Sequence, residues 1–265
     1  MLECVINVSE GGRLSTVDVI ARNAGDHLLD LHADRDHNRS VITVVGEDAA
    51  RAVSTAAVLA LDLNHHAGAH PRFGVVDVVP FVPLFSTPMT TAIEARDRFA
   101  RWLAEELGVP CFLYGTERSL PELRRRAFVD LEPDVGPRRP HPTAGATAVG
   151  ARQPLVAYNL WLAHDDLETA RAVARELRSE HVRALGLAVG PRVQVSLNLV
   201  EPEAFGPADA FDAVAARATI DHAELVGLIP QAVLDRTPIG RWAELDLSAD
   251  RSIEARLAAR GLADA

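Results

Sequence analysis

The sequence predicts an α/β (α+β) protein made of two tandem ferredoxin-like βαββαβ subdomains. Strand-like and helix-like patterns follow one another in the order β-α-β-β-α-β, and the same order recurs beyond residue 152. With 265 residues, of which 48% are hydrophobic, the chain is long enough to build two cores. We therefore expect an N-terminal subdomain at residues 1–152 and a C-terminal subdomain at residues 153–265. Because clefts between domains are common ligand sites, we also expect a ligand cleft between the two.

The first strands and the first helix follow from local patterns. Residues 2–8 alternate in hydrophobicity, as a half-buried strand does. The serine–threonine pair at 15–16 can cap a helix that runs to about residue 24. Residues 27–33 and 40–46 are typical of strands, and the polar residues 34–39 form the loop between them.

The next elements alternate between helix and strand. Residues 49–63 are rich in alanine with a 3.6-residue period, which predicts a helix, and 75–82 form an apolar run typical of a buried strand. A helix at 90–107 and a strand at 111–114 follow. The stretch 117–142 is polar and rich in proline, so we expect an irregular connection there.

Beyond residue 152 the pattern begins again, which is the main reason for expecting a second subdomain of the same kind. The expected elements are a strand at 154–162, a helix at 166–181, strands at 184–189 and 192–200, a helix at 208–222 and a strand at 224–229. We expect further helices at the end of each unit.

The composition excludes several classes of function. A net charge of −10 argues against nucleic acid or an anionic membrane as the main partner. No lysine is present, which excludes a pyridoxal-phosphate Schiff base and a phosphate-loop lysine. Cys4 and Cys111 lie in apolar runs, so we expect two buried thiols. Without a membrane-length apolar run or the basic flank of a signal peptide, the sequence predicts a cytoplasmic protein.

The most informative segment is residues 66–83, HAGAHPRFGVVDVVPFVP. Pro71 disfavours a helical backbone at His70, and Gly68 and Gly74 punctuate the same turn. The imidazole of His70 is therefore expected on a stiff loop that enters the following strand. Rigid loops at strand ends commonly carry catalytic side chains.

This segment resembles the H-x-G-x-H-P-R-x-G-x-x-D-V-x-P-F-x-P signature of the glutamate formimidoyltransferases, which belong to the formiminotransferase domain family. Six further blocks are similar to the family pattern in the right order. They are ECVINVSEG at 3–11, DHNRSVITVVG at 36–46, LAEELGVPCFLYG at 103–115, GATAVGAR at 145–152, VQVSLNLVEPE at 193–203 and ELVGLIP at 224–230. Seven ordered blocks resemble the stand-alone form of the family, which has no cyclodeaminase domain.

The resemblance implies both an architecture and a reaction. In this family, a tunnel between two α/β subdomains brings the co-substrate tetrahydrofolate to N-formimino-L-glutamate. The formimino group passes to the folate, giving 5-formiminotetrahydrofolate and glutamate in histidine degradation. The resemblance thus implies small-molecule substrates, no metal, a homodimer, and a separate protein as the cyclodeaminase that processes the product.

Such a transfer needs one group that accepts and donates a proton near neutral pH, as histidine does. His70 aligns with the catalytic histidine of the family; the alternative is a loop histidine that hydrogen-bonds its own backbone. Arg72, two positions on, points to the same side of an extended backbone. It binds a substrate carboxylate or stabilises the charged intermediate, or else it pairs with Asp77 as a strand-end arginine. Asp77 interrupts an apolar strand and is either a paired buried carboxylate or a group that orients His70.

The polar loop between the second and third strands ends in Asn38 and Arg39, a pair that matches the family pattern. Asn38 is either a substrate-binding residue or a turn cap, and we expect Arg39 to bind a substrate carboxylate. At the end of the first strand, Asn7, Ser9 and Glu10 can enter a cleft. Their residue types are equally explained as turn residues that lead into a helix.

A glycine- and proline-rich loop falls where the family binds folate. Its glycines let backbone amides approach a ligand, and its prolines keep it stiff. By its composition alone, this segment is a connecting loop. Its position relative to the motifs makes it the candidate for binding folate. Arg138 or Arg139 would then neutralise a glutamyl tail. The loop consists of Gly136, Pro137, Arg138, Arg139, Pro140, His141, Pro142, Thr143, Ala144 and Gly145.

Four positions depart from the family pattern. Ala69 stands where an acidic residue is common, Ile6 where a proline is, Val8 where a phenylalanine is, and Ala144 where an aromatic residue is. Two alternatives to the leading interpretation therefore stay open. One is a related folate-dependent transferase with a different formyl, formimino or amidine donor, and the other is a non-catalytic folate-binding protein.

His65, His66 and His70 also suggest a metal site, because histidines four apart on one helix face converge. Gly68 and Pro71 interrupt the helix that this geometry needs, and the sequence contains no HExxH motif or cysteine ligand set. We therefore expect no metal.

Overall fold

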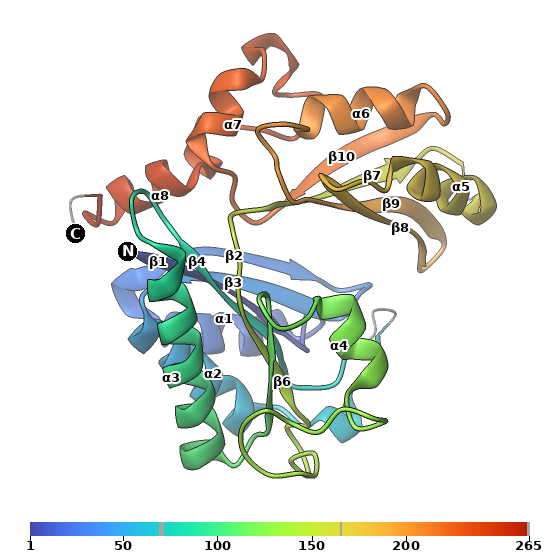
Figure 1. Cartoon of the computed structure of the whole chain (residues 1–265). Helices are drawn as coiled ribbons and strands as arrows, with labels where there is room; N and C mark the ends of the chain where they lie inside the picture. Colours follow the sequence, from blue (N-terminus) through green and yellow to red (C-terminus); the bar gives the residue numbers. More distant parts are fainter. Residues whose placement is uncertain (69–71, 165, 264–265) are drawn as a thin grey trace. The chain divides into compact units, whose positions relative to one another are not determined.

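The computed structural model describes residues 1–68, 72–164 and 166–263. The chain divides into two compact units, Met1–Gln153 and Pro154–Ala265, each of which is described by itself. Each unit contains a β-α-β-β-α-β core (Figure 1), so the mixed α/β fold class expected from the sequence is confirmed.

The core of the first unit is ferredoxin-like. Its elements are β1 (Leu2–Val8), α1 (Leu14–Arg22), β2 (Leu28–Asp34), β3 (Arg39–Val45), α2 (Glu47–Ala60) and β4 (Val76–Pro83). β1 lies between β3 and β4 and runs antiparallel to both, while β2 pairs with the outer side of β3. Short 3₁₀ helices at Gly25–His27 (η1) and Leu63–His65 (η2) complete this part.

Two helices and two strands extend this core. They are α3 (Met89–Leu107), β5 (Cys111–Tyr114), α4 (Leu120–Arg126) and β6 (Thr147–Ala151). β6 runs parallel to both β4 and β5, which gives the sheet order β2-β3-β1-β4-β6-β5. The expectation of an irregular connection is wrong for residues 120–126, which form α4. The sequence does contain a start signal for this helix, namely a serine cap followed by a proline in the first turn. In the structure the Ser119 hydroxyl accepts from the Glu122 amide at 3.3 Å, and Pro121 lies in the first turn.

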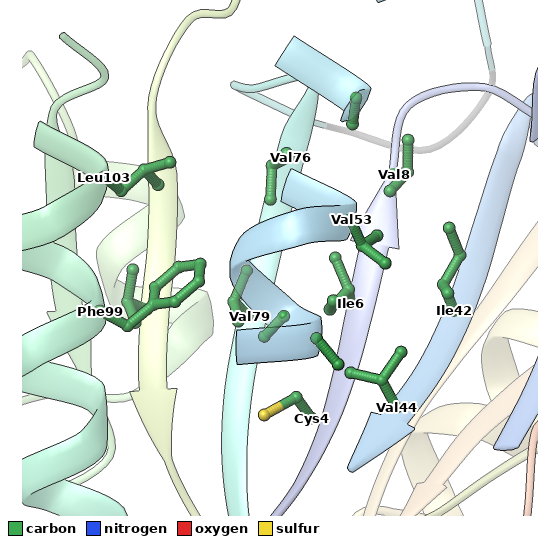
Figure 2. Close-up of a cluster of buried hydrophobic side chains, with 14 of the residues drawn as sticks. Cys4, Ile6, Val8, Ile42, Val44, Val53, Val76, Val79, Phe99 and Leu103 are labelled. Carbon is green, nitrogen blue, oxygen red and sulfur yellow. The ribbon is translucent and has the colours of Figure 1, made fainter. Parts of the chain in front are cut away.

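The main core of the first unit lies between its sheet and α1, α2 and α3. Figure 2 shows Cys4, Ile6 and Val8 of β1 beside Val53 of α2, with Phe99 and Leu103 contributed by α3. Neighbouring residues of a strand point to opposite faces. Cys111 belongs to this core, whereas Phe112 packs with Leu123, so α4 covers the face opposite α3.

Cys4 and Cys111 are both buried free thiols, as expected. Burial raises the pKa of the Cys4 thiol well above its ordinary value, and the nearby Glu3 carboxylate raises it further. A buried thiol that stays protonated behaves as a small apolar side chain. These cysteines therefore serve the packing of the first unit.

The second unit repeats the same order of elements. They are β7 (Val156–Leu162), α5 (Leu167–Leu177), β8 (Val182–Val189), β9 (Arg192–Leu199), α6 (Pro207–Ala215) and β10 (Ile220–Val226). The four strands form an antiparallel sheet in the order β10-β7-β9-β8, which is again ferredoxin-like. Alternate residues of the sheet pack with α5 and α6 in one apolar core.

The second unit differs from expectation at α6. A helix was expected to residue 222, but α6 ends at Ala215 and Ile220 pairs with Leu162 as the start of β10. The β-branched pair Thr219–Ile220 and the available edge of β7 favour a strand over an alanine-rich continuation of the helix. The chain continues through α7 (Gln231–Arg236), 3₁₀ turns at Ile239–Arg241 and Ala249–Arg251, and α8 (Ile253–Ala259). Among the described residues, the helices are all too short or too polar to cross a bilayer.

Candidate functional site

The motif segments of the first unit gather at one end of its sheet. β1 ends where β3 and β4 begin, because Val8 pairs with Ser40 on one side and with Val76 on the other. β6 is parallel to β4 and starts at the same end. The amide of Ser9 donates to the Val75 carbonyl at 2.8 Å. Sequence blocks that lie far apart in the chain therefore meet at this edge.

Asn38 joins two of these segments. It adopts a left-handed backbone with φ of 47°, a conformation that asparagine tolerates better than most residues. Its Oδ1 accepts from the amides of Gly11 at 2.9 Å and Gly12 at 3.2 Å, and its Nδ2 donates to the Ala67 carbonyl at 2.8 Å. Its Nδ2 also lies 3.4 Å from Nδ1 of His66. The side chain thus ties the loop after β1 to the beginning of the histidine motif.

Gly11 is required by this close packing. A Cβ atom at this position would lie 2.1 Å from the carbonyl oxygen of Asp34 and 2.6 Å from the amide nitrogen of Arg39. Both neighbours are backbone atoms, which cannot rotate away. Only glycine fits between the end of β2 and the start of β3.

Glu10 organises the same turn from the other side. Its carboxylate accepts from the backbone amides of Gly12 at 2.9 Å and Arg13 at 2.8 Å, and it pairs with the Arg13 guanidinium at 2.7 Å. Burial acts to raise the pKa of Glu10, but these hydrogen bonds outweigh it and lower the pKa below its ordinary value. Glu10 therefore stays charged next to Asn38. Glu10, Asn38, His66 and Arg72 are called the strand-end cluster below.

Arg72 enters the cluster from the far side of the histidine motif. Its Nη1 donates to the carbonyl of Asn38 and its Nη2 to that of His37, both at 2.7 Å. Burial lowers the pKa of the Arg72 guanidinium, Asp77 opposes this, and the charge of Arg39 lowers it further. Arg72 thus holds the loop before β3 in place while delivering positive charge to the site.

The loop that Arg72 holds also contains a contact between His37 and Asp34 that is largely buried. His37 Nδ1 contacts the Asp34 carboxylate, which accepts in addition from the His37 amide at 2.9 Å. Burial acts to raise the pKa of Asp34, but the hydrogen bonds from His37 outweigh it and lower the pKa to about 2. The pair stabilises the turn that precedes Arg39, the first residue of β3, which is half-buried.

Asp77 is a buried carboxylate with two partners. It accepts from the Phe73 amide at 2.9 Å and from Arg124 of α4 at 2.5 Å. The Arg124 guanidinium also lies over the Phe73 ring, 5.6 Å from its centroid. Asp77 therefore anchors the strand that follows the histidine motif, consistent with the paired carboxylate that was one alternative from the sequence.

The proposed folate loop has two parts with different surroundings. Residues 136–140 are exposed, and the side chain of Arg138, 82% exposed, lies 3.5 Å from Glu132. Residues 141–145 are anchored, since the Leu63 amide donates to the Thr143 carbonyl at 2.7 Å and Gly145, at φ of 72°, bridges to Gly74. Only this second part is held directly against the segments that flank the histidine motif.

Three residues of the motif, Ala69, His70 and Pro71, lie outside the described residues. The role expected for His70 therefore stays a prediction, although the structure describes the residues on both sides of it. His65 belongs to the alternative hypothesis of a metal site. Its side chain is 86% exposed and lies 3.6 Å from Asp62. Within residues 1–68, 72–164 and 166–263, no group of three or more histidine, cysteine, aspartate or glutamate side chains is arranged to bind a metal ion.

Sequence reasoning missed two features of this site. Arg124 was overlooked because α4 was not expected, although the cap at Ser119 signals the helix. The Asp34–His37 pair was treated only as loop, although an aspartate three residues before a histidine in a turn is a common local pairing. Both features support the loops that carry the predicted residues.

Comparison with known proteins agrees with the motif blocks. Residues 1–152 match the model of the formiminotransferase domain, N-terminal subdomain. The chain is 34% identical over 270 residues to the glutamate formimidoyltransferase of Streptococcus pyogenes serotype M1, covering 88% of this chain and 90% of that protein. It is also 34% identical over 274 residues to the glutamate formimidoyltransferase of Thermoplasma acidophilum, covering 89% and 90%.

A third relative is longer than these two. The chain is 34% identical over 278 residues to the formimidoyltransferase-cyclodeaminase of Sus scrofa, and the match covers 89% of this chain but 51% of that protein. The three relatives each match about nine-tenths of this chain, and the domain model matches residues 1–152. The chain therefore belongs to the formiminotransferase family.

Proposed function

We propose that this protein transfers the formimino group of N-formimino-L-glutamate to tetrahydrofolate, giving 5-formiminotetrahydrofolate and glutamate. The observation that carries the proposal is the strand-end cluster, in which three motif blocks of the family are joined by hydrogen bonds around His66 and Arg72. Relatives that match over about nine-tenths of their length are named glutamate formimidoyltransferases. Tetrahydrofolate acts here as co-substrate, and the reaction needs no metal.

The chemistry requires balanced proton movement. N5 of the folate attacks the amidine carbon of the donor and loses its proton as the tetrahedral intermediate forms. The C–N bond to glutamate then breaks once the glutamate nitrogen has gained a proton. A single acid/base group beside both nitrogens serves both steps, and we assign this role to His70.

The remaining residues of the cluster bind or position substrate. Arg39 and Arg72 supply positive charge toward the carboxylates of the amino-acid donor. Asn38 holds the loop that carries Arg39, and Asp77 holds the strand that follows Arg72. In the folate loop, residues 141–145 lie against the motif and residues 136–140 are exposed, which suits a pterin near the cluster and a glutamyl tail along Arg138 and Arg139.

The decisive experiment is a transfer assay with the purified protein. Tetrahydrofolate is incubated with N-formimino-L-glutamate or, in parallel, N-formyl-L-glutamate, and the pterin absorbance is followed. A spectral change with the formimino donor alone supports the proposal. A change with the formyl donor alone favours the related transferase that Ala69 leaves open. Binding of folate without turnover of either donor favours a non-catalytic folate-binding protein.

Two properties of the family complete the proposal. We place the protein in the cytoplasm, because its substrates are metabolites of the cell interior. We also propose a homodimer, which size-exclusion chromatography with light scattering tests directly. An elution at 28.6 kDa, the mass of one chain, would contradict the dimer.

A further inference from the structure

His66 is the member of the strand-end cluster whose hydrogen bonding is incomplete. It follows η2 with an extended backbone, and its amide donates to the Leu63 carbonyl at 3.1 Å. The imidazole Nε2 is buried and has no hydrogen-bond partner among the residues that the structure describes. Buried polar groups are nearly always paired, so an unpaired ring nitrogen at a candidate site indicates a missing partner.

The surroundings of the other ring nitrogen define the tautomer. Asn38 Oδ1 accepts from two backbone amides, so the opposite end of its side chain must be the NH₂ group. This NH₂ group lies 3.4 Å from His66 Nδ1, which must therefore accept. In a neutral imidazole the single proton is then on Nε2. The unpaired group of His66 is consequently an N–H donor.

The electrostatic environment keeps this ring neutral. Burial lowers the pKa of His66 and the charge of Arg72 lowers it further, while Glu10, Asp77 and the backbone of Ser9 act in the opposite direction. A neutral His66 with Nδ1 occupied by Asn38 has no free lone pair, so it is unsuited to accept a proton during the transfer.

The partner that this donor lacks is indicated by the groups around it. Arg72 is the positive group that acts on the ring, and Glu10 and Asp77 are the negative groups. An N–H donor binds an oxygen acceptor, and a carboxylate oxygen in that position would also meet the positive charge of Arg72.

We propose that His66 is a substrate-binding residue whose Nε2–H donates to a carboxylate oxygen of the amino-acid substrate. The identity of that substrate rests on the proposed function, whereas the tautomer of His66 does not depend on it. His66 Nε2 and Arg72 Nη2 both lie beside Gly68, since a Cβ atom there would lie 3.1 Å from the first and 2.6 Å from the second. His66 thus helps to select the amino-acid substrate, whereas His70 transfers the proton.

Two isosteric substitutions separate the ring nitrogens. The amide nitrogen of glutamine reaches the position of Nε2, whereas that of asparagine reaches only the position of Nδ1. Binding of L-glutamate and of N-formimino-L-glutamate is measured by calorimetry for the wild type, His66→Gln and His66→Asn. His65→Asn, at the exposed neighbour, is the matched control and should bind as the wild type does.

We expect His66→Asn to bind both ligands about tenfold to a hundredfold more weakly, the usual worth of a hydrogen bond to a charged group. His66→Gln should recover most of this loss, and tetrahydrofolate affinity should change little in both. Equal weakening of the two variants, or wild-type affinity in His66→Asn, would overturn the proposal. Melting temperatures of the variants identify any loss that comes from misfolding.

A measurement on the unmodified protein keeps the test independent of folding. Nitrogen-15 NMR of the histidine side chains should show the His66 proton on Nε2 near neutral pH, and a proton on Nδ1 would overturn the assignment. If the transfer assay fails while glutamate still binds, the proposed function is wrong but the role of His66 in binding is not contradicted. If transfer occurs and is insensitive to His66→Asn, the proposed function is supported and the role of His66 is wrong.

Discussion

The ion pair between Asp77 and Arg124 offers the sharpest test of how this site is held together. The two side chains are 2.5 Å apart, and their exposed fractions are 3% for Asp77 and 19% for Arg124. Asp77→Asn keeps an acceptor for the Phe73 amide but removes the charge. Arg124→Met keeps the helix propensity and most of the apolar stem of the side chain.

Each single substitution should lower the free energy of unfolding by about 2–3 kcal/mol. Removing one partner of a fully buried pair costs about 3–5 kcal/mol because the other charge is left desolvated, and the partial exposure of Arg124 reduces this. The double variant should lose less than the sum of the two, with a coupling energy of about 1–3 kcal/mol. Loss of the contact with the Phe73 ring adds about 0.5–1 kcal/mol to the Arg124 variant alone.

The matched control lies two residues along the same helix. Arg126 pairs with Glu122 and Asp130 at 3.1 Å, but its side chain is 42% exposed. Exposed pairs contribute little, so Arg126→Met should change the unfolding free energy by less than about 0.5–1 kcal/mol.

Urea denaturation at pH 7 gives the free energies, and hydrogen exchange of the peptides covering α4 and β4 locates the loss. If Arg124→Met is no more destabilising than Arg126→Met, or if the coupling energy is below about 0.5 kcal/mol, the pair does not anchor β4 as argued.

Further predictions concern turnover, ligands and pH. His70→Ala should lower turnover by roughly 10²–10⁴-fold with folate affinity nearly intact; more than about a tenth of wild-type turnover would show that another residue moves the proton. Activity should survive dialysis against a chelator, and inactivation that zinc restores would revive the histidine metal site. Reduced folate should raise the melting temperature. Replacing Arg138 and Arg139 with alanine should weaken the binding of polyglutamylated folate more than the binding of the monoglutamate. The control is alanine at Arg171 and Arg175, which line a hollow of about 410 Å³ along α5 in the second unit. If that control reproduces the selective loss, the tail binds there instead. Asp34, with a pKa of about 2 against 3.8, contributes about 2 kcal/mol of stability that is present above pH 4 and lost as the pH falls toward 2. The stability difference between wild type and Asp34→Asn should therefore be largest at pH 7 and shrink below pH 4, and a constant difference would contradict the pairing with His37.

Much of the fold follows from local sequence. β1 and β5 have the bounds that alternation and apolar runs predict, and the repeated β-α-β-β-α-β order is present in both units. These elements agree because their hydrophobic period matches their burial in the sheet. The end of α6 and the existence of α4 were not foreseen. In the first case strand pairing overrode an alanine-rich helical pattern, and in the second a short polar helix offered little apolar periodicity.

By itself, the sequence determined which residue types are available for chemistry and which family they resemble, because ordered motif blocks and the absence of lysine are properties of the chain alone. Only the tertiary structure decided what these residues contact. Arg72 donates to the carbonyls of His37 and Asn38, and Asp77 pairs with Arg124, 47 residues away. The tautomer of His66 likewise depends on Asn38, whose orientation is set by amides on another loop. Hydrogen bonds between segments this far apart depend on strand order and register, which local patterns do not encode.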